Sequence, residues 1–205
     1  MKNTILLNGM REIHIFFKCQ ISRLQIKLFL RKNREIWLEV GSGDSGKNGW
    51  TTMDIANNCD IFWDVRYGLP FPNESISKIY SSHFLEHLSF AEGQKFLGEC
   101  IRVLIPSGTF SICIPNARIY IEAYMNRLPL DNFCKYKPAF NSTTKIDYVN
   151  YMAYMAGHHN YMFDEENLLF ILKLAGFRNV RMRGFDSDID LKQRDYESMY
   201  GEAEK

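Results

Sequence analysis

Apolar and polar residues alternate along the chain with either the period of an α-helix or the period of a β-strand. Each change from one period to the other marks a boundary between expected helices and strands. Residues 11–34 carry apolar side chains at helical spacing with basic residues between them: Ile13, Phe16, Phe17, Ile21, Leu24 and Leu28. This pattern predicts an amphipathic N-terminal helical segment within residues 1–34, packed on the edge of the domain that follows. The same basic and apolar surface also fits contact with a membrane surface or a partner protein, and both interpretations stay open.

From residue 35 onward, short apolar runs alternate with helical patterns. Strands are expected at 35–40, 50–55, 60–65, 76–82 and 109–115, and two closing strands at 177–185 and 197–205. Helices are expected at 90–104 and 164–176; the second has acidic residues in its first turn and a glycine at its end. Strands that alternate with helices predict one α/β domain over residues 35–205, with a mainly parallel sheet.

Residues 118–161 follow neither period. The segment is rich in tyrosine and phenylalanine and contains several asparagines. We interpret it as an insertion or lid over a site, with a plain helical elaboration as the open alternative.

Composition bounds the class of protein and its partners. The 205 residues are 46% apolar and 24% charged, as expected of one soluble domain, and the formal net charge is +1. The net positive charge is therefore too small to attract nucleic acid electrostatically, and we expect no nucleic-acid partner. The five cysteines are scattered and odd in number, which favours reduced thiols in a cytoplasmic protein. We see no signal peptide and no run of about 18 apolar residues that could span a bilayer.

A glycine-rich loop, GSGDSGKNG, follows the first expected strand. Gly41, Gly43 and Gly46 match G-x-G-x-x-G, the pattern of dinucleotide-binding folds. That site needs a helix directly after the glycines, whose N-terminus holds the pyrophosphate. Only residues 44–49 separate Gly43 from Trp50, which is too short for a full crossover helix. The first crossover must be abbreviated, so an NAD-dependent oxidoreductase is only an alternative.

A ligand without phosphates does not need a helix N-terminus for binding, so the missing helix affects it least. S-adenosylmethionine is such a ligand. Glu39, at the end of the first strand, can orient the loop or the ligand's ammonium group. Asp54, at the end of the second strand, can accept hydrogen bonds from both ribose hydroxyls. Asp64 and Val65, which end the third strand, can hold the adenine amino group and ring face. Carboxyl ends of parallel strands share one crevice, so we expect these residues to surround one ligand.

Four stretches together resemble a known family: LEVGSG, MDI, WDVRYGLPFPNESISKIYSSHFLEHL and RVLIPSGTFSICIPN. They are similar to the class I S-adenosylmethionine-dependent methyltransferases, most of all to the methyltransferase type 11-like group often seen beside bacterial surface-glycan genes. The resemblance covers residues 35–116 well. It implies a Rossmann-like, seven-stranded, mostly parallel sheet with an antiparallel last strand. The abbreviated first crossover departs from the family, as does Ser107 where a glycine is common.

The resemblance also implies a function and a set of site residues. We expect a methyltransferase that acts on a small molecule, for example a sugar or a surface-glycan intermediate. Nine residues are expected to bind the cofactor: Glu39, Gly41, Ser42, Gly43, Asp54, Asp64, Val65, Ser82 and His83. A methyltransferase-like module that binds cofactor without catalysis is the alternative.

The stretch SSHFLEH contains H-x-x-E-H at residues 83–87, the signature of inverted zinc proteases. A third ligand would be needed, and Glu165 or Glu166 is the candidate downstream. The protease motif lies inside a long helix, whereas this one directly follows a strand at the crevice end. We therefore expect no metal here, and a zinc hydrolase is a lesser alternative.

Methyl transfer to a hydroxyl benefits from a general base, and histidine suits this role near neutral pH. His83 and His87 are the candidate catalytic residues, ranked in that order by position. His158 and His159 are candidate substrate contacts, with exposed or structural histidines as the alternative. For His87 the structural alternative is a hydrogen-bonded residue that supports the turn.

Overall fold

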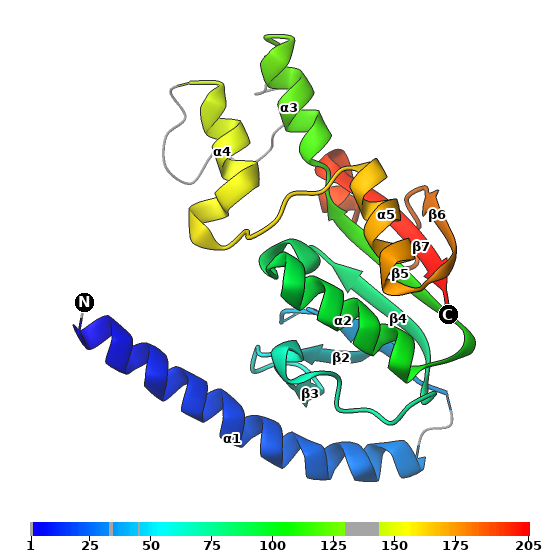
Figure 1. The fold of residues 1–205 in the computed structure, drawn as a ribbon. Helices are drawn as coiled ribbons and strands as arrows, with labels where there is room; N and C mark the ends of the chain where they lie inside the picture. The colour runs from blue at the N-terminus through cyan, green and yellow to red at the C-terminus, as the bar shows by residue number, and fades with distance from the viewer. Residues whose placement is uncertain (1, 33–34, 45, 130–143) are drawn as a thin grey trace.

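Seven strands form one sheet in the order β3-β2-β1-β4-β5-β7-β6 (Figure 1). The computed structural model describes residues 2–32, 35–44, 46–129 and 144–205. The strands are β1 (Trp37–Val40), β2 (Thr51–Asp54), β3 (Ile61–Phe62), β4 (Ile76–Ser82), β5 (Leu104–Pro115), β6 (Arg178–Arg183) and β7 (Ser198–Glu204). Strand β7 runs antiparallel to both of its neighbours, and the other pairs are parallel. The seven-stranded sheet with an antiparallel last strand is therefore confirmed.

Five α-helices accompany the sheet in the described residues: α1 (Lys2–Lys32), α2 (Phe90–Val103), α3 (Ala117–Met125), α4 (Ile146–Tyr154) and α5 (Glu165–Ala175). Helices α2 and α5 lie side by side on one face of the sheet (Figure 1). A reciprocal pair of hydrogen bonds between Ser89 and Glu92 begins α2. Asp164 caps α5, and Gly176 ends it in the left-handed conformation. These two helices begin and end where the sequence predicts.

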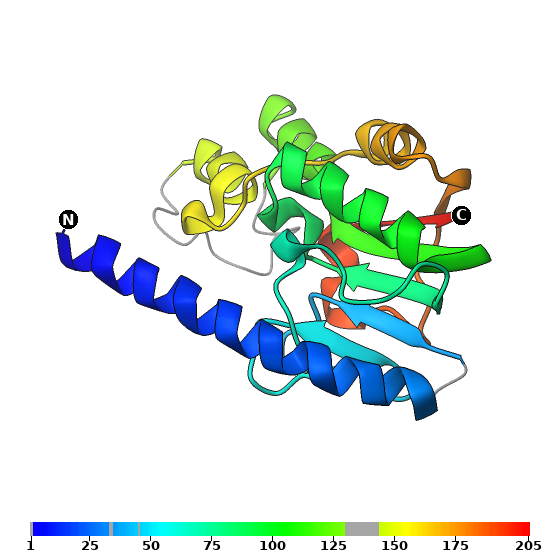
Figure 2. The same cartoon turned by 60° about the horizontal axis from the view of Figure 1, so that its bottom comes forward.

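Helix α1 packs against the β3 edge of the sheet, but with a different face from the expected one (Figure 2). The buried row is Ile15, Cys19, Ser22 and Ile26, at spacings of four and three residues. The expected apolar stripe is exposed instead, with Ile13, Phe16, Phe17, Ile21 and Leu28 between 46% and 62% accessible; the Leu24 side chain lies outside the described part. The narrow edge of the sheet covers only one row of α1 side chains. Two of the four residues in this row are Cys19 and Ser22, which carry less apolar surface than the residues of the expected stripe. Contact of α1 with a membrane surface or partner protein stays a prediction.

No helix in the described residues has both the length and the apolarity that crossing a membrane requires. The division of the chain at residue 34 also stays a prediction.

Residues 118–161 contain most of α3 and all of α4, which contact each other. A small separate core joins them, built from Tyr120, Tyr148 and Met152. Residues 130–143 of this segment lie outside the described part. Whether the segment acts as a lid stays a prediction.

The two faces of the sheet differ in chemistry. Leu38, Val40 and Ile79 point into the main core beneath α2. On the opposite face, Tyr80 donates a hydrogen bond to Asp190, which is also paired with Arg183. The chain reverses its direction of growth between β1 and β4, so a crevice opens at the carboxyl ends of these two neighbours. The described part of 41–50, between β1 and β2, has no helix, as the short spacing predicts.

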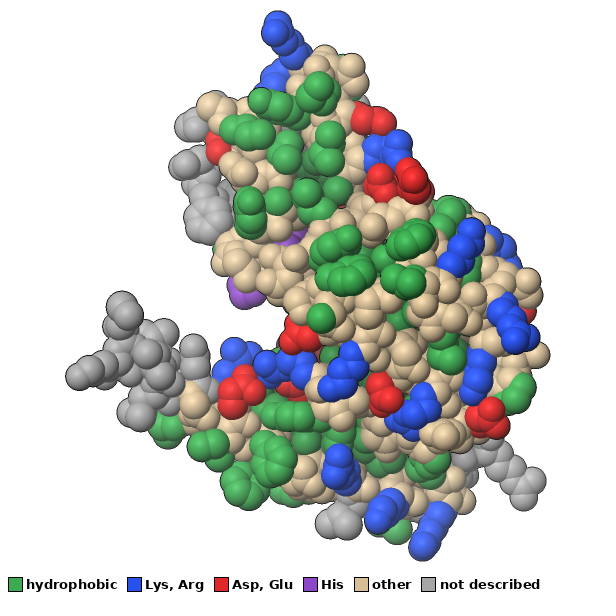
Figure 3. Space-filling model, in the orientation of Figure 1, with side chains coloured by type: hydrophobic (Ala, Val, Ile, Leu, Met, Phe, Trp, Pro, Cys, Tyr) green, Lys and Arg blue, Asp and Glu red, His purple; other side chains and the backbone are tan. Residues whose placement is uncertain are grey.

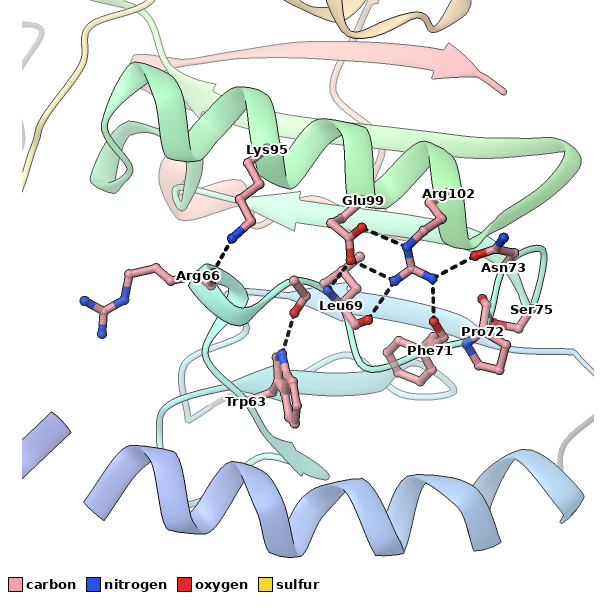
Figure 4. A network of polar contacts seen from close by, with 11 residues as sticks. Trp63, Arg66, Leu69, Phe71, Pro72, Asn73, Ser75, Lys95, Glu99 and Arg102 are labelled. Carbon is pink, nitrogen blue, oxygen red and sulfur yellow. Dashed lines mark hydrogen bonds and ion pairs between the residues drawn. The ribbon is translucent and has the colours of Figure 1, made fainter. Parts of the chain in front are cut away.

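A network of hydrogen bonds holds the segment between β3 and β4 against α2 (Figure 4). Arg102 of α2 pairs with Glu99 and donates to three groups of the segment, the carbonyls of Leu69 and Phe71 and the side chain of Asn73. Other contacts of the segment are Glu99 with the Leu69 amide, Trp63 with the Gly68 carbonyl and Lys95 with the Arg66 carbonyl. The network therefore holds residues 66–73, between β3 and β4, against α2.

Arg102→Met is expected to lower stability by about 2 kcal/mol, because two backbone carbonyls lose their donors at once. For a chain of this size the melting temperature should fall by about 4–8 °C. Lys95→Met is the control: among the described residues Lys95 donates only to the Arg66 carbonyl, so its loss should cost less than about 1 kcal/mol. Equal melting temperatures for the two variants would contradict this role of Arg102.

Candidate functional site

Two adjoining hollows lie at the carboxyl ends of β1, β2 and β4. The first, the helix hollow, lies between α1 and the ends of β2 and β3; the second, the loop hollow, lies against residues 41–44; each has a volume of about 370 Å³. Four residues line both: Gly41, Asp54, Phe84 and His87. The hollows therefore form one crevice, within the size range of small-molecule sites. In Figure 3 the surface is notched between α1 and the part that holds α3 and α4, with histidine at the upper edge of the notch.

The nine residues expected to bind a cofactor all line this crevice. Asp64 and Val65 line the helix hollow, and the remaining seven line the loop hollow. The fold thus brings them together, while their binding role stays a prediction.

Two contacts fix the glycine loop. The buried Glu39 carboxylate accepts hydrogen bonds from the Lys47 amide and ammonium group, 3.0 and 3.2 Å away. Gly41 has a left-handed φ of 73°, and a Cβ there would lie 2.5 Å from the Phe84 ring. Only glycine allows this ring to lie against the backbone. Glu39 therefore orients the loop, and its contact with the ligand's ammonium group stays a prediction.

Asp54 stands where the two hollows meet. Its Oδ2 accepts a hydrogen bond from the Gly43 amide and its Oδ1 from the Ala56 amide, both at 2.9 Å. A carboxylate has about four acceptor positions, so two remain. The side chain is half-buried and borders both hollows. It can accept two further hydrogen bonds from a ligand that lies across the junction.

Asp64 is engaged more fully. Arg66 donates to it from its backbone amide and from two guanidinium nitrogens, and Arg66 also pairs with Glu12 of α1. The pairing raises the pKa of Arg66 above its ordinary value. A ligand amino group can reach the Asp64 carboxylate only if Arg66 moves aside. Arg66 is 42% exposed, so its side chain has room to turn toward solvent.

Ser82 and His83 end β4 on the side of the loop hollow. Arg194, from the segment between β6 and β7, donates to the Ser82 carbonyl and hydroxyl at 3.3 and 3.2 Å. His83 has a left-handed φ of 50°, and its Nε2 lies 2.7 Å from Ser198 Oγ. Burial, with the nearby Arg194 charge, lowers the pKa of His83 to about 3. His83 is therefore neutral at pH 7 and a weak proton acceptor.

Glu86 is a buried carboxylate, 2% exposed, and neither oxygen has a hydrogen-bond partner among the described residues. Burial raises its pKa to about 8. His87 Nε2 and His83 Nδ1 each lie 3.9 Å from Glu86 Oε1. The ligand atoms of Glu86, His87 and His159 all lie within 4.8 Å of one another.

The remaining predicted histidine, His158, behaves differently. Its side chain is exposed, and it lines neither hollow. Its backbone carbonyl is 2.9 Å from His87 Nδ1. His159 is buried, and its Nδ1 lies 2.8 Å from the Met152 carbonyl. Burial lowers the pKa of His159. The substrate-contact role of both residues stays a prediction.

The zinc ligands considered from the sequence are not brought together. Glu165 accepts hydrogen bonds from Asn116 and Arg118 instead. The downstream residue that joins the motif is His159, not Glu165 or Glu166.

Several further residues line the crevice. They are Phe84, Arg194, Asn160 and, on α1, Arg11 and Glu12. Phe84 lies inside a motif that was considered, so its contact with Gly41 could have been suspected. The others come from segments far away in the sequence, and no local pattern marks them.

Comparisons with known proteins agree with this geometry. A family model described as a methyltransferase domain matches residues 58–112. A S-adenosylmethionine-dependent methyltransferase structure from Archaeoglobus fulgidus aligns over 91% of this chain and 94% of its own, at 15% identity and a TM-score of 0.51. The chain has the class I methyltransferase fold.

Two further methyltransferase-fold structures are similar. One, from Methanosarcina mazei, aligns over 83% of this chain and 92% of its own, at 16% identity and a TM-score of 0.53. The other is phosphoethanolamine N-methyltransferase 2 from Haemonchus contortus, in complex with S-adenosyl-L-methionine. It aligns over 83% of this chain and 48% of its own, at 13% identity and a TM-score of 0.51. Among curated proteins, none matches the chain.

Within the methyltransferase fold, this chain replaces a helical first crossover with a short loop. Asp54 holds Gly43 and Glu39 holds Lys47 from the neighbouring strand ends, and the described part of the loop has no helix to supply a dipole. Side-chain carboxylates thus position the loop.

Proposed function

We propose that the chain is a S-adenosylmethionine-dependent methyltransferase that acts on a small molecule, a sugar or a surface-glycan intermediate. The observation that carries the proposal is the Asp54 carboxylate, which borders both hollows and keeps two acceptor positions for a pair of hydroxyls. A ligand with a ribose at its centre and two chemically different ends fits this arrangement.

The residues on either side of Asp54 suit the two ends of the cofactor. The helix hollow contains Ile55 and Val65 as apolar surface for a purine ring, with Asp64 beside them. The loop hollow contains Arg194, and a guanidinium is well suited to bind the carboxylate of an amino-acid end. When bound, the cofactor supplies a sulfonium methyl group as the electrophile.

The chain's own contribution is positioning and exclusion of water. The Phe84 ring lies against Gly41 between the two hollows, so it is placed to pack on the cofactor near its centre. His87 borders both hollows and is the more accessible of the two candidate catalytic histidines. It is therefore the better-placed group to face an acceptor, whereas His83 is directed toward Ser198 and Glu86.

The acceptor class rests on the resemblance to methyltransferases found beside surface-glycan genes and on the near-neutral net charge. A cytoplasmic location is part of the same proposal. The four described cysteines, Cys19, Cys59, Cys100 and Cys113, are free thiols, the state that a reducing compartment maintains.

A transfer assay with methyl-labelled S-adenosylmethionine tests the activity, with nucleotide sugars and extracted glycans as acceptors. We expect label in an acceptor that contains a free hydroxyl, and S-adenosylhomocysteine in equal amount. The binding part is tested separately by melting curves with S-adenosylmethionine, S-adenosylhomocysteine and NAD. A higher melting temperature with NAD alone would refute the cofactor assignment. A higher melting temperature with the adenosyl ligands, without any methyl transfer, would indicate a non-catalytic module.

A further inference from the structure

The buried Glu86 carboxylate is surrounded by nitrogen lone pairs instead of donors. It lies in a short 3-10 turn, Leu85–His87, directly after β4. A buried carboxylate without a hydrogen-bond donor is costly, and such groups are normally paired or bound to a cation.

The partners of the neighbouring histidines determine which ring nitrogen carries the proton. His87 Nδ1 and His159 Nδ1 each face a backbone carbonyl, that of His158 and that of Met152. A carbonyl only accepts, so in both rings Nδ1 carries a hydrogen, and in the neutral form of each ring Nε2 keeps a lone pair. His87 Nε2 lies 3.9 Å from Glu86 Oε1, and a ring nitrogen of His159 belongs to the same cluster.

His83 follows the same rule. The Ser198 hydroxyl donates to the Arg194 carbonyl, so its oxygen accepts from His83 Nε2–H. The lone pair of His83 is then on Nδ1, 3.9 Å from Glu86 Oε1. In their neutral forms the three imidazoles direct lone pairs at the Glu86 side chain, an arrangement that a bound cation would complete.

We propose that Glu86, His87 and His159 bind a divalent first-row transition-metal ion of the Zn²⁺ class. Two imidazoles and one carboxylate suit this class of ion, whereas Mg²⁺ and Ca²⁺ prefer oxygen ligands. The Nδ1–H bonds of both histidines to carbonyls are the outer contacts that usually orient metal-binding imidazoles. Ligand atoms around tetrahedral zinc lie about 3.3 Å apart, so the three groups must close by roughly 1 Å.

The site has an open side toward the crevice. Glu86 and His159 are buried, at 2% and 8% exposure, whereas the His87 side chain is 36% exposed and lines both hollows. Three protein ligands with a further position open to a cavity are typical of metal sites that bind substrate. The ion would lie in the wall of the crevice, beside the cofactor's expected place.

This placement deepens the proposed function and rests on it: the acceptor atom is a hydroxyl oxygen that binds the ion. A bound metal lowers the pKa of such a hydroxyl, whose proton is released to solvent. The oxygen then forms a bond to the methyl carbon as the carbon–sulfur bond breaks, giving a methyl ether and S-adenosylhomocysteine. Charge balances, because the sulfonium cation is consumed and one proton is released.

The test is metal binding by the full-length, untagged, chelator-treated chain, without cofactor. Equilibrium dialysis against Zn²⁺ should give one equivalent, and Co²⁺ should produce a visible absorption band of a low-symmetry nitrogen and oxygen site. Glu86→Gln and His159→Gln should each weaken Zn²⁺ binding by at least about 100-fold, the effect of losing one of three ligands. His158→Gln, which alters the adjacent exposed histidine, is the matched control and should bind as wild type does.

Loss of binding through misfolding is separated by melting curves without metal. Glu86→Gln replaces a buried carboxyl group, whose oxygens have no hydrogen-bond partner among the described residues, by an uncharged amide of similar shape, so its metal-free melting temperature should not fall. No zinc equivalent in wild type, or unchanged zinc affinity in Glu86→Gln, would overturn the proposal; a protonated Glu86 would then account for the cluster. S-adenosylhomocysteine binding by the same chelator-treated protein is measured in parallel, so failure of the metal site leaves the cofactor site independently tested.

Discussion

Asp54→Asn is expected to weaken binding of S-adenosylhomocysteine by about 100-fold or more. The substitution replaces one carboxylate oxygen by an NH2 group, which cannot accept from the Gly43 or Ala56 amide or from a ribose hydroxyl. Two charge-assisted hydrogen bonds to ligand hydroxyls contribute about 3 kcal/mol together, which corresponds to about two orders of magnitude in dissociation constant. Calorimetric titration of both proteins measures the change directly.

Asp60→Asn is the matched control for this variant. Asp60 accepts from the Thr52 amide and hydroxyl, so it supports β2 as Asp54 does, but it lines neither hollow. We expect lower stability with unchanged ligand affinity. If Asp54→Asn binds as tightly as Asp60→Asn, the ribose assignment is wrong.

Gly41→Ala is expected to cost about 3 kcal/mol of stability. The left-handed φ of 73° penalises any side chain by about 1–2 kcal/mol, and the new Cβ would overlap the Phe84 ring at 2.5 Å. The melting temperature should fall by about 6–12 °C. Because the displaced ring borders both hollows, ligand affinity should fall as well.

A double-mutant cycle separates the two causes. In a Phe84→Ala background the steric part disappears, so Gly41→Ala should cost only the backbone strain, about 1–2 kcal/mol. Gly98→Ala is a control within α2, where an added Cβ meets open space and helix propensity improves. An equal cost of Gly41→Ala with and without Phe84 would show that the ring contact contributes nothing.

The strands and helices that position the crevice were predictable because each has a strong local signal. β4 occupies 76–82 as expected, α5 lies between an acidic cap and a terminal glycine, and the short Gly43–Trp50 spacing excludes a crossover helix. β3 is shorter than expected, Ile61–Phe62, because the chain turns into a 3-10 helix at Val65. Local patterns set such elements, whereas tertiary contacts set their ends.

The face of α1 and the histidine cluster were not predictable for a different reason. Cys19 and Ser22 are buried only because they meet the sheet edge, and no periodicity of α1 alone indicates this. His159 joins Glu86 and His87 across more than seventy residues, through a segment without clear period. Arg194 contacts Ser82 although the two residues are 112 positions apart in the sequence. Contacts between distant segments follow from the fold, which one sequence does not specify residue by residue.

The central claim is that the crevice at Asp54 is a S-adenosylmethionine site. Isothermal titration of the wild-type, metal-free chain with S-adenosylhomocysteine tests this most directly, because it requires neither an acceptor nor turnover. We expect saturable binding with one ligand per chain, and no heat of binding with NAD at the same concentrations. Absence of binding by S-adenosylhomocysteine, or saturable binding of NAD instead, would contradict it.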